Sequence, residues 1–253
     1  MEKFRRLFTA AALAGLIAGV FVTLVHQVTT VPVILSAEVY EKAAAAQVPA
    51  EPGAAAQGSQ MGGMSSMDMG AMPAAHEHDH AVGVWEPEDG LERTAFTVVA
   101  DVLTGIGFAL LLVAFYAVWG GKVDWLTGLY FGLAGFAAAT LAPSLGLPPE
   151  VPGTEAAPLL ARQLWWVATA ALTGGGLALL FLTRRPLLVL GGIAMIVLPH
   201  AYGAPQPADY ASAAPEALAH RFVVAATMTS LLFWAALGLL TGFFYNRLVP
   251  QRA

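Results

Sequence analysis

The sequence predicts an all-α membrane protein, a polytopic helical bundle that forms a single membrane domain over residues 1–253. Hydrophobic residues make up 57% of the chain and charged residues only 11%, whereas a soluble domain carries about 25% charged residues. Several apolar runs approach or exceed the roughly 20 residues that cross a bilayer as a helix. The chain has no cysteine, which excludes disulfides, thiolate metal sites and thiol nucleophiles.

The expected spans follow the chain in order. The clear apolar runs are Leu7–Val28, Thr94–Val118, Trp125–Leu145, Leu164–Thr183 and Phe222–Tyr245. A further run, Leu187–Tyr202, is shorter and contains Pro199, so hydropathy alone does not distinguish a span from a re-entrant or buried segment. The first run has a Lys/Arg-rich start but no clean cleavage site after it, and we expect a retained helix rather than a secretory signal.

The distribution of charge favours about six transmembrane helices. With six spans both termini lie on one side, and that side holds eight of the 12 Lys and Arg residues. The positive-inside rule then places both termini in the cytoplasm. Most of the 17 acidic residues fall in the opposite, outer loops, where their negative potential would concentrate cations.

Repeated features suggest that the six runs form three helical hairpins. Each odd run ends near a proline, and each even run opens with a leucine followed closely by an arginine. A threefold repeat explains this pattern, and so does the tendency of proline and arginine to mark membrane borders. Glycine pairs at i, i+4 spacing predict close helix contacts, within one chain or between copies, so a homo-oligomer stays open. These pairs are Gly15/Gly19, Gly128/Gly132 and Gly238/Gly242.

The first hairpin carries a long insertion, residues 43–83, which is rich in Ala, Gly, Pro and Ser and is expected to be a disordered extracytoplasmic loop. Its soft and borderline metal ligands are Met61, Met64, Met67, Met69, Met72, His76, His78 and His80. Thioethers favour Cu(I), whereas imidazole and carboxylate groups serve Co, Ni, Zn and Cu(II). The composition predicts metal capture by this loop; the alternative is a solvated low-complexity linker.

Asp101 is the ionisable residue that stands out within a span. It lies eight residues past Arg93, about 12 Å along its helix, and we expect it near the bilayer midplane. A carboxylate at that depth indicates function by default. Thr94, Thr97 and Thr104 share its helix face and would add oxygen ligands for a cation. The alternative is a protonated or threonine-bonded Asp101 that only holds helices together.

Three further histidines lie at the ends of expected spans. On the six-span topology His26, His200 and His220 all approach the outer boundary, so they are candidate metal ligands at an entry site below the loop. An interfacial histidine without a ligand role is the alternative for each. Together with Asp101 and the loop residues, they complete the predicted metal ligands.

The sequence also excludes several classes of function. It has no G-x-x-x-x-G-K-[ST] phosphate loop, no H-E-x-x-H motif and no G-x-S-x-G motif, so we expect no ATP hydrolysis by that route, no enzyme and no catalytic residue. We expect a lipid bilayer, no nucleic-acid partner and no permanently bound cofactor. The residues favour transport of a transition-metal cation. A non-transporting metal-binding scaffold or sensor, and a redox protein with His26 and His200 as haem ligands, stay open.

Several motifs resemble the CbtA family of cobalt transporter subunits. They are the W-x-P-x-D-G-x-E-R block of residues 85–93, Leu141-Ala142-Pro143 and Leu198-Pro199-His200, and the resemblance runs nearly end to end. It implies a bacterial inner-membrane protein in cobalt uptake linked to cobalamin supply. It also implies a small one-span CbtB-type partner subunit. The methionine cluster departs from the family pattern, which leaves a copper or nickel transporter open.

Overall fold

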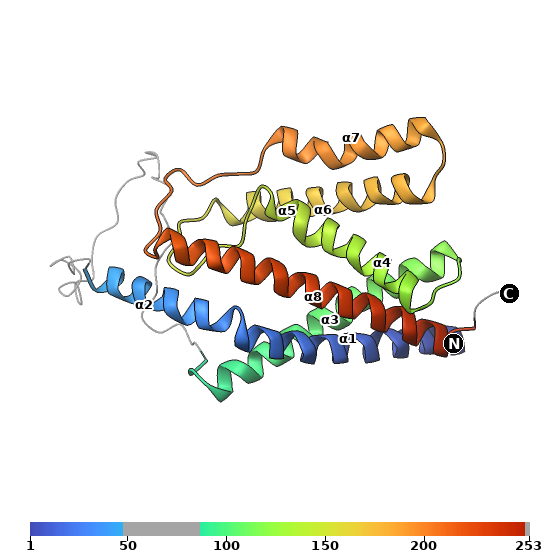
Figure 1. Ribbon diagram of the computed structural model, residues 1–253, viewed down its shortest axis with the longest axis horizontal. Helices are drawn as coiled ribbons and strands as arrows, with labels where there is room; N and C mark the ends of the chain where they lie inside the picture. Colours follow the sequence, from blue (N-terminus) through green and yellow to red (C-terminus); the bar gives the residue numbers. More distant parts are fainter. Residues whose placement is uncertain (48–86, 251–253) are drawn as a thin grey trace, which may run out of the picture.

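The computed structural model describes residues 1–47 and 87–250, and helices dominate this part of the chain (Figure 1). The elements are α1 (Glu2–Val28), α2 (Val31–Gln47), α3 (Leu91–Trp119), α4 (Trp125–Phe136), the π-helix η1 (Ala137–Leu141), α5 (Ala142–Ser144), α6 (Leu159–Leu182), α7 (Pro186–Tyr202) and α8 (Glu216–Leu248). Among the described residues, five helical stretches are long and apolar enough to span a membrane, and α7 is a shorter apolar helix. The predicted all-α membrane bundle is confirmed.

Both termini lie at the same end of the bundle (Figure 1). The Arg6 guanidinium donates a hydrogen bond to the Leu248 carbonyl, with 3.4 Å between the two atoms. The α3–α4 and α6–α7 connections lie at that end too, and they carry Lys122 and the Arg184–Arg185 pair. The basic residues of the described chain that were assigned to one side by the sequence are therefore together in space. We refer to this as the terminal end of the bundle, and to the opposite end as the outer end.

Helix packing depends on glycines whose missing side chains let backbones meet. Helix α1 packs along α3 and α8, and α4 packs along α8. Gly15 lies against the backbone of α3 at Gly105, and Gly128 of α4 lies against Gly238 and Gly242 of α8. The contacts predicted from the glycine pairs are confirmed, and they form within one chain. Helix α7 packs along α6 rather than along α8, so the third expected hairpin is not a packed pair.

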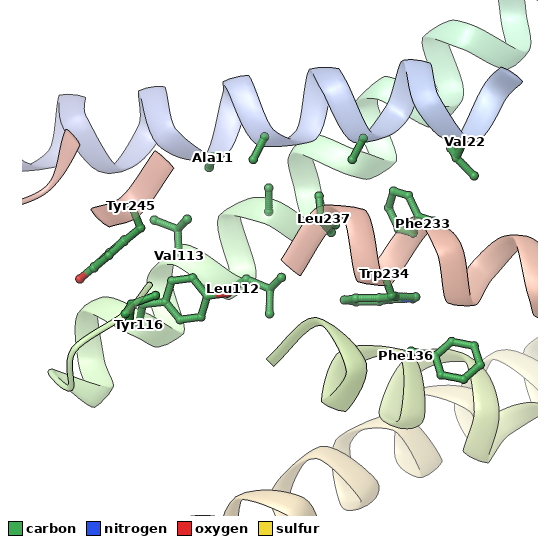
Figure 2. Close-up of a cluster of buried hydrophobic side chains, with 14 of the residues drawn as sticks. Ala11, Val22, Leu112, Val113, Tyr116, Phe136, Phe233, Trp234, Leu237 and Tyr245 are labelled. Carbon is green, nitrogen blue, oxygen red and sulfur yellow. The ribbon is translucent and has the colours of Figure 1, made fainter. Parts of the chain in front are cut away.

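The hydrophobic core lies where α1, α3, α4 and α8 meet (Figure 2). Its larger buried members are Val22, Leu112, Val113, Tyr116, Phe136, Phe233, Trp234, Leu237 and Tyr245. The Tyr116 hydroxyl, which would be costly to bury alone, shares a 3.1 Å hydrogen bond with Thr241 of α8. Val22, Phe233 and Trp234 form the outer edge of this core, and a polar cavity begins on their other side.

Helix α2 was not predicted. The sequence pattern placed a proline turn after the first span, but Pro32 stands in the first turn of a second helix, where a missing N–H costs nothing. Residues 43–47 of the expected disordered loop form the end of this helix. The rest of that loop, with its methionines and with His76, His78 and His80, lies outside the described residues.

Helix α2 and two loops pack together at the outer end. Ala37 of α2 is buried with Val151 and Ala214, and an antiparallel bridge joins Thr154 to Ser212. Arg93 at the start of α3 pairs with Glu38 of α2 and, at 2.9 Å, with Asp89. These contacts fix α2 over the outer end of the bundle.

Candidate intramembrane cation site

A polar cavity of about 250 Å³ lies inside the bundle, between α1, α3, η1, α6 and α8. Its polar lining residues are His26, Asp101, Thr104, Thr140, Thr229 and Ser230. Asp101 comes 10 residues after Leu91 and 18 before Trp119, which corresponds to about 15 Å and about 27 Å along α3. The cavity therefore lies on the outer half of α3 rather than midway along it.

The Asp101 carboxylate uses its two oxygens differently. Oδ2 accepts a hydrogen bond from the Thr23 hydroxyl of α1 at 2.8 Å. This threonine-bonded Asp101 is the alternative to a ligand role that the sequence left open. Oδ1 faces the imidazole of His26, whose Nε2 lies 3.9 Å away. The side chain of Asp101 is 19% exposed and that of His26 is 28% exposed. One carboxylate oxygen is thus held by the protein, and the other remains directed toward a histidine.

The close contact between α1 and α3 brings these two residues together. Gly19 lies against Val102 and the carbonyl of Asp101, with no room for a side chain between the helices. Thr23 and His26 follow one and two turns later on the same helix, so they reach Asp101 from the C-terminal side of this contact. The small residues of α1 are therefore part of what positions the site.

His26 is also held from its other ring nitrogen. Nδ1 lies 2.6 Å from the Thr30 hydroxyl oxygen, at the break between α1 and α2. The neighbouring Thr29 donates its hydroxyl to the Val25 carbonyl at 2.8 Å and shares a 2.9 Å hydrogen bond with Thr229 of α8. The interruption of the first span thus occurs at the cavity, and threonine hydroxyls satisfy its polar groups.

A second helix interruption borders the cavity on the opposite side. The expected span of residues 125–145 is confirmed as a continuous helical stretch, but its α-helical hydrogen bonding is interrupted by η1, and Pro143 follows in α5. Proline has no N–H to donate, so one carbonyl of this turn loses its helical partner, and π-turns of this kind occur often at functional sites. Thr140 of η1 accepts a 3.2 Å hydrogen bond from the Trp234 indole. This turn adds oxygen atoms to the cavity wall.

Aromatic rings line the cavity on the side that faces the terminal end. Phe108 packs on Trp234 with ring centroids 4.7 Å apart, and Phe233 packs on Trp234 at 5.9 Å. All three line the cavity and belong to, or pack against, the hydrophobic core. We call them the aromatic floor. No polar group of this floor other than the Trp234 indole, already bonded to Thr140, faces the cavity.

A wider cavity of about 640 Å³ lies next to the first, and Trp166 lines both. It contains Glu150, whose carboxylate pairs with Arg162 at 3.2 Å. Burial raises the pKa of Glu150, and the charge of Arg162 opposes that rise. A carboxylate therefore stands beside the candidate site, in the connection between α5 and α6.

Of the other described residues predicted from the sequence, Thr104 lines the same cavity as this pair, and the rest lie apart from it. Thr94 and Thr97 donate their hydroxyls to backbone carbonyls of their own helix. His200 packs against the Trp165 ring on the α6–α7 side, and His220 is exposed in the first turn of α8. Within residues 1–47 and 87–250, no group of three or more His, Cys, Asp or Glu side chains is placed to hold a metal. The site therefore combines one imidazole and one carboxylate with hydroxyls.

Sequence reasoning missed Thr140, Thr229 and Ser230. The only sequence signal near Thr140 is Pro143, which lies inside an apolar run and predicts a turn at the end of the span rather than a π-turn within it. Thr229 and Ser230 have no signal in their own segment, because threonine and serine are common in membrane helices. Their role depends on α8 passing beside α1, which the sequence does not specify.

These features define a polytopic α-helical membrane protein with an ionisable, polar site of about 250 Å³ inside its bundle. The chain belongs to the CbtA family, described as a probable cobalt transporter subunit, whose family model matches residues 4–246. It is therefore a multi-pass membrane protein of a cobalt transporter, and the description as a subunit implies a partner protein. No curated protein and no solved structure gives a significant match to the chain.

Proposed function

We propose that this chain carries Co²⁺ across the bacterial inner membrane into the cytoplasm, and that Asp101 and His26 are the central ligands of the cation. The observation that carries the proposal is the 3.9 Å between His26 Nε2 and Asp101 Oδ1 inside a polar cavity. This separation is too long for a hydrogen bond, which ends near 3.5 Å. It is short enough for one metal ion to contact both atoms.

The distances support a bridging cation. Bonds from a first-row divalent metal to imidazole nitrogen and carboxylate oxygen are about 2.0–2.2 Å, as for zinc, so one ion can join atoms up to about 4.2 Å apart. Imidazole and carboxylate together suit borderline divalent ions such as cobalt, nickel and zinc. The hydroxyls of Thr104, Thr229 and Ser230 line the same space and would bind the remaining waters or the ion.

The cavity chemistry favours cobalt or nickel over copper(I). Its lining contains no thioether and no thiol, and soft ligands of these kinds are what Cu(I) selects. Methionines occur instead in residues 61–72, where composition alone supports metal capture together with His76, His78 and His80. His200 and His220 would act on the approach from the outer end. We propose capture by the loop followed by transfer to Asp101 and His26.

The charges support the proposed orientation, and the family supports the proposed partner. The terminal end carries the clustered basic residues, so the positive-inside rule supports cytoplasmic termini and, with them, a cavity nearer the outer surface. Inward movement of a divalent cation would gain about 4.6 kcal/mol per 100 mV, at about 2.3 kcal/mol per charge. We propose a small CbtB-type membrane subunit as the partner and cobalamin supply as the purpose, with no enzymatic step.

The test is cobalt uptake into proteoliposomes that contain the chain with and without the partner subunit. Asp101→Asn keeps the shape of the side chain and removes its charge, and His26→Gln removes the imidazole. Both should reduce uptake of radioactive cobalt at least tenfold. Asp209→Asn, the same change on an exposed loop, is the matched control and should transport like the parent.

A metal-binding scaffold or sensor is the competing function. It shares the outer loop but has no need for a carboxylate inside the bundle. If the parent chain binds cobalt but moves none in either preparation, or if Asp101→Asn and Asp209→Asn transport equally well, the transport site proposed here is wrong. Parallel measurements with nickel and copper establish the metal preference.

A further inference from the structure

Thr30 occupies an unusual position, because it contacts the proposed ligand His26 without lining the cavity itself. Its side chain lies in the break between α1 and α2 and is 4% exposed. Its backbone carbonyl accepts the hydrogen bond of Ile34 at 2.9 Å in the first turn of α2. The hydroxyl therefore has a fixed position from which it can act on only a few neighbouring groups.

We infer that Thr30 is a positioning residue that holds His26 with its proton on Nδ1, so that the Nε2 lone pair faces Asp101 and is free to bind the cation. This inference rests on the proposed function. A neutral imidazole carries one N–H and one lone pair, and the group bonded to one ring nitrogen sets what the other nitrogen offers to a metal.

The hydrogen bonds around Thr30 favour this tautomer. The hydroxyl has a single proton, and two acceptors are within reach: the His26 carbonyl at 3.5 Å and Nδ1 at 2.6 Å. If the hydroxyl donates to the carbonyl, its oxygen accepts from Nδ1–H, and both contacts are satisfied. If the hydroxyl donates to Nδ1 instead, the imidazole must carry its own proton on Nε2. Asp101 Oδ1, 3.9 Å from Nε2, is too distant to accept a hydrogen bond from it.

The arrangement with the proton on Nδ1 thus makes two hydrogen bonds, whereas the other makes one. It also leaves the lone pair where the carboxylate and the cation need it. Metal-binding histidines are commonly held in this way by a partner on the second nitrogen, and loss of that partner typically weakens metal binding 10–100-fold. Thr30 supplies this partner from outside the cavity.

Matched variants separate a hydrogen-bonding role from a space-filling role. Thr30→Val has nearly the same shape but no hydroxyl, and Thr30→Ser keeps the hydroxyl and loses a methyl group. The full chain would carry His76→Ala, His78→Ala and His80→Ala, so that the loop imidazoles do not contribute to the measured binding. Three histidines then remain, and His26→Gln identifies the signals of His26.

Cobalt affinity is measured by calorimetry in lipid nanodiscs, and the tautomer of His26 by ¹⁵N NMR of labelled histidine. We expect Thr30→Val to weaken cobalt binding 10–100-fold and to shift the proton of His26 from Nδ1 toward Nε2. Thr30→Ser should bind like the parent. Equal melting temperatures of the two variants would show that the fold is kept.

Two results would overturn the inference while leaving the proposed site intact. One is a normal affinity and an unchanged ¹⁵N spectrum for Thr30→Val, combined with lost binding in His26→Gln. The other is Thr30→Ser binding as weakly as Thr30→Val, because then the methyl group matters rather than the hydroxyl. Normal cobalt binding by His26→Gln would instead refute the proposed site, and this inference with it.

Discussion

Gly19 offers the most direct test of how helix packing sets the cation site. A methyl group built on Gly19 would lie 2.5 Å from Val102 Cα and 2.8 Å from the Asp101 carbonyl oxygen, whereas ordinary contact begins at 3.4 Å. Gly19→Ala therefore requires α1 and α3 to separate by about 0.9 Å at this level, since both neighbours are backbone atoms that cannot rotate away. Overpacking of this kind costs about 1–3 kcal/mol of stability.

The same movement changes the site. His26 lies on α1 and Asp101 on α3, so a separation of about 0.9 Å would widen the Nε2–Oδ1 gap from 3.9 Å to about 4.8 Å. A single ion with bonds of about 2.1 Å spans at most about 4.2 Å, so one of the two ligands is lost. We expect Gly19→Ala to weaken cobalt binding at least tenfold and to lower the melting temperature.

Calorimetry in nanodiscs and thermal unfolding measure the two effects. Gly107→Ala is the matched control, because it adds the same methyl group to α3 at a position with no atom within 4 Å. If Gly19→Ala binds cobalt as tightly as Gly107→Ala, the two ligands do not act together on one ion, and the link from packing to binding is refuted.

Two further predictions concern the N-cap of α4 and the ion pair that joins α2 to α3. Asp124 caps α4, because its carboxylate accepts a hydrogen bond from the Thr127 N–H at 2.7 Å. This bond holds the pKa of Asp124 below its usual value. The contribution of the charged carboxylate to stability is therefore present above about pH 4 and is lost as the pH falls through the lower pKa of the folded protein. Asp124→Ala should lower the melting temperature at pH 7 and Asp124→Asn should largely keep it, and equal melting of Asp124→Ala and the parent would contradict the cap. Glu38→Gln should loosen α2 by up to about 1 kcal/mol, because its pair with Arg93 is partly exposed, and hydrogen exchange in α2 should rise. Asp89→Asn should have less effect, since Asp89 is 66% exposed, and the reverse order would show that Arg93 holds α2 by another contact.

The spans could be predicted from the sequence because a membrane helix is specified locally, by length and apolar composition. Close helix contacts could be predicted from Gly15, Gly19, Gly128 and Gly132 for a similarly local reason, although not that α1 would meet α3 and α4 would meet α8. Asp101 could be singled out because a carboxylate in an apolar run is costly wherever the run packs. In each case the residues that support the prediction lie within a single segment of the sequence.

The remaining features depend on contacts between distant segments. Helix α2 contains Glu38, Glu41 and Lys42 and has no clear apolar face; its core contact comes from Ala37 packing with Val151 and Ala214. The polar cavity joins His26, Asp101 and Thr229, which meet only because α1 lies between α3 and α8. The six-span topology predicts that His26, His200 and His220 approach the outer side, but their lateral positions depend on α7 packing against α6.

The aromatic floor has a consequence for the kinetics of transport. Phe108, Phe233 and Trp234 place aromatic rings on one side of the cavity, and the adjoining cavity of about 450 Å³ that reaches Leu182 is lined by apolar and aromatic side chains. An ion stripped of its ligands would face a solvation cost of tens of kcal/mol there. A membrane potential of 100 mV supplies a divalent ion with only about 4.6 kcal/mol, so no voltage in a living cell could force an ion through this closed arrangement. Helices must part and close again for each ion delivered. Uptake should therefore saturate with cobalt concentration, at the turnover of a carrier rather than the conductance of a pore.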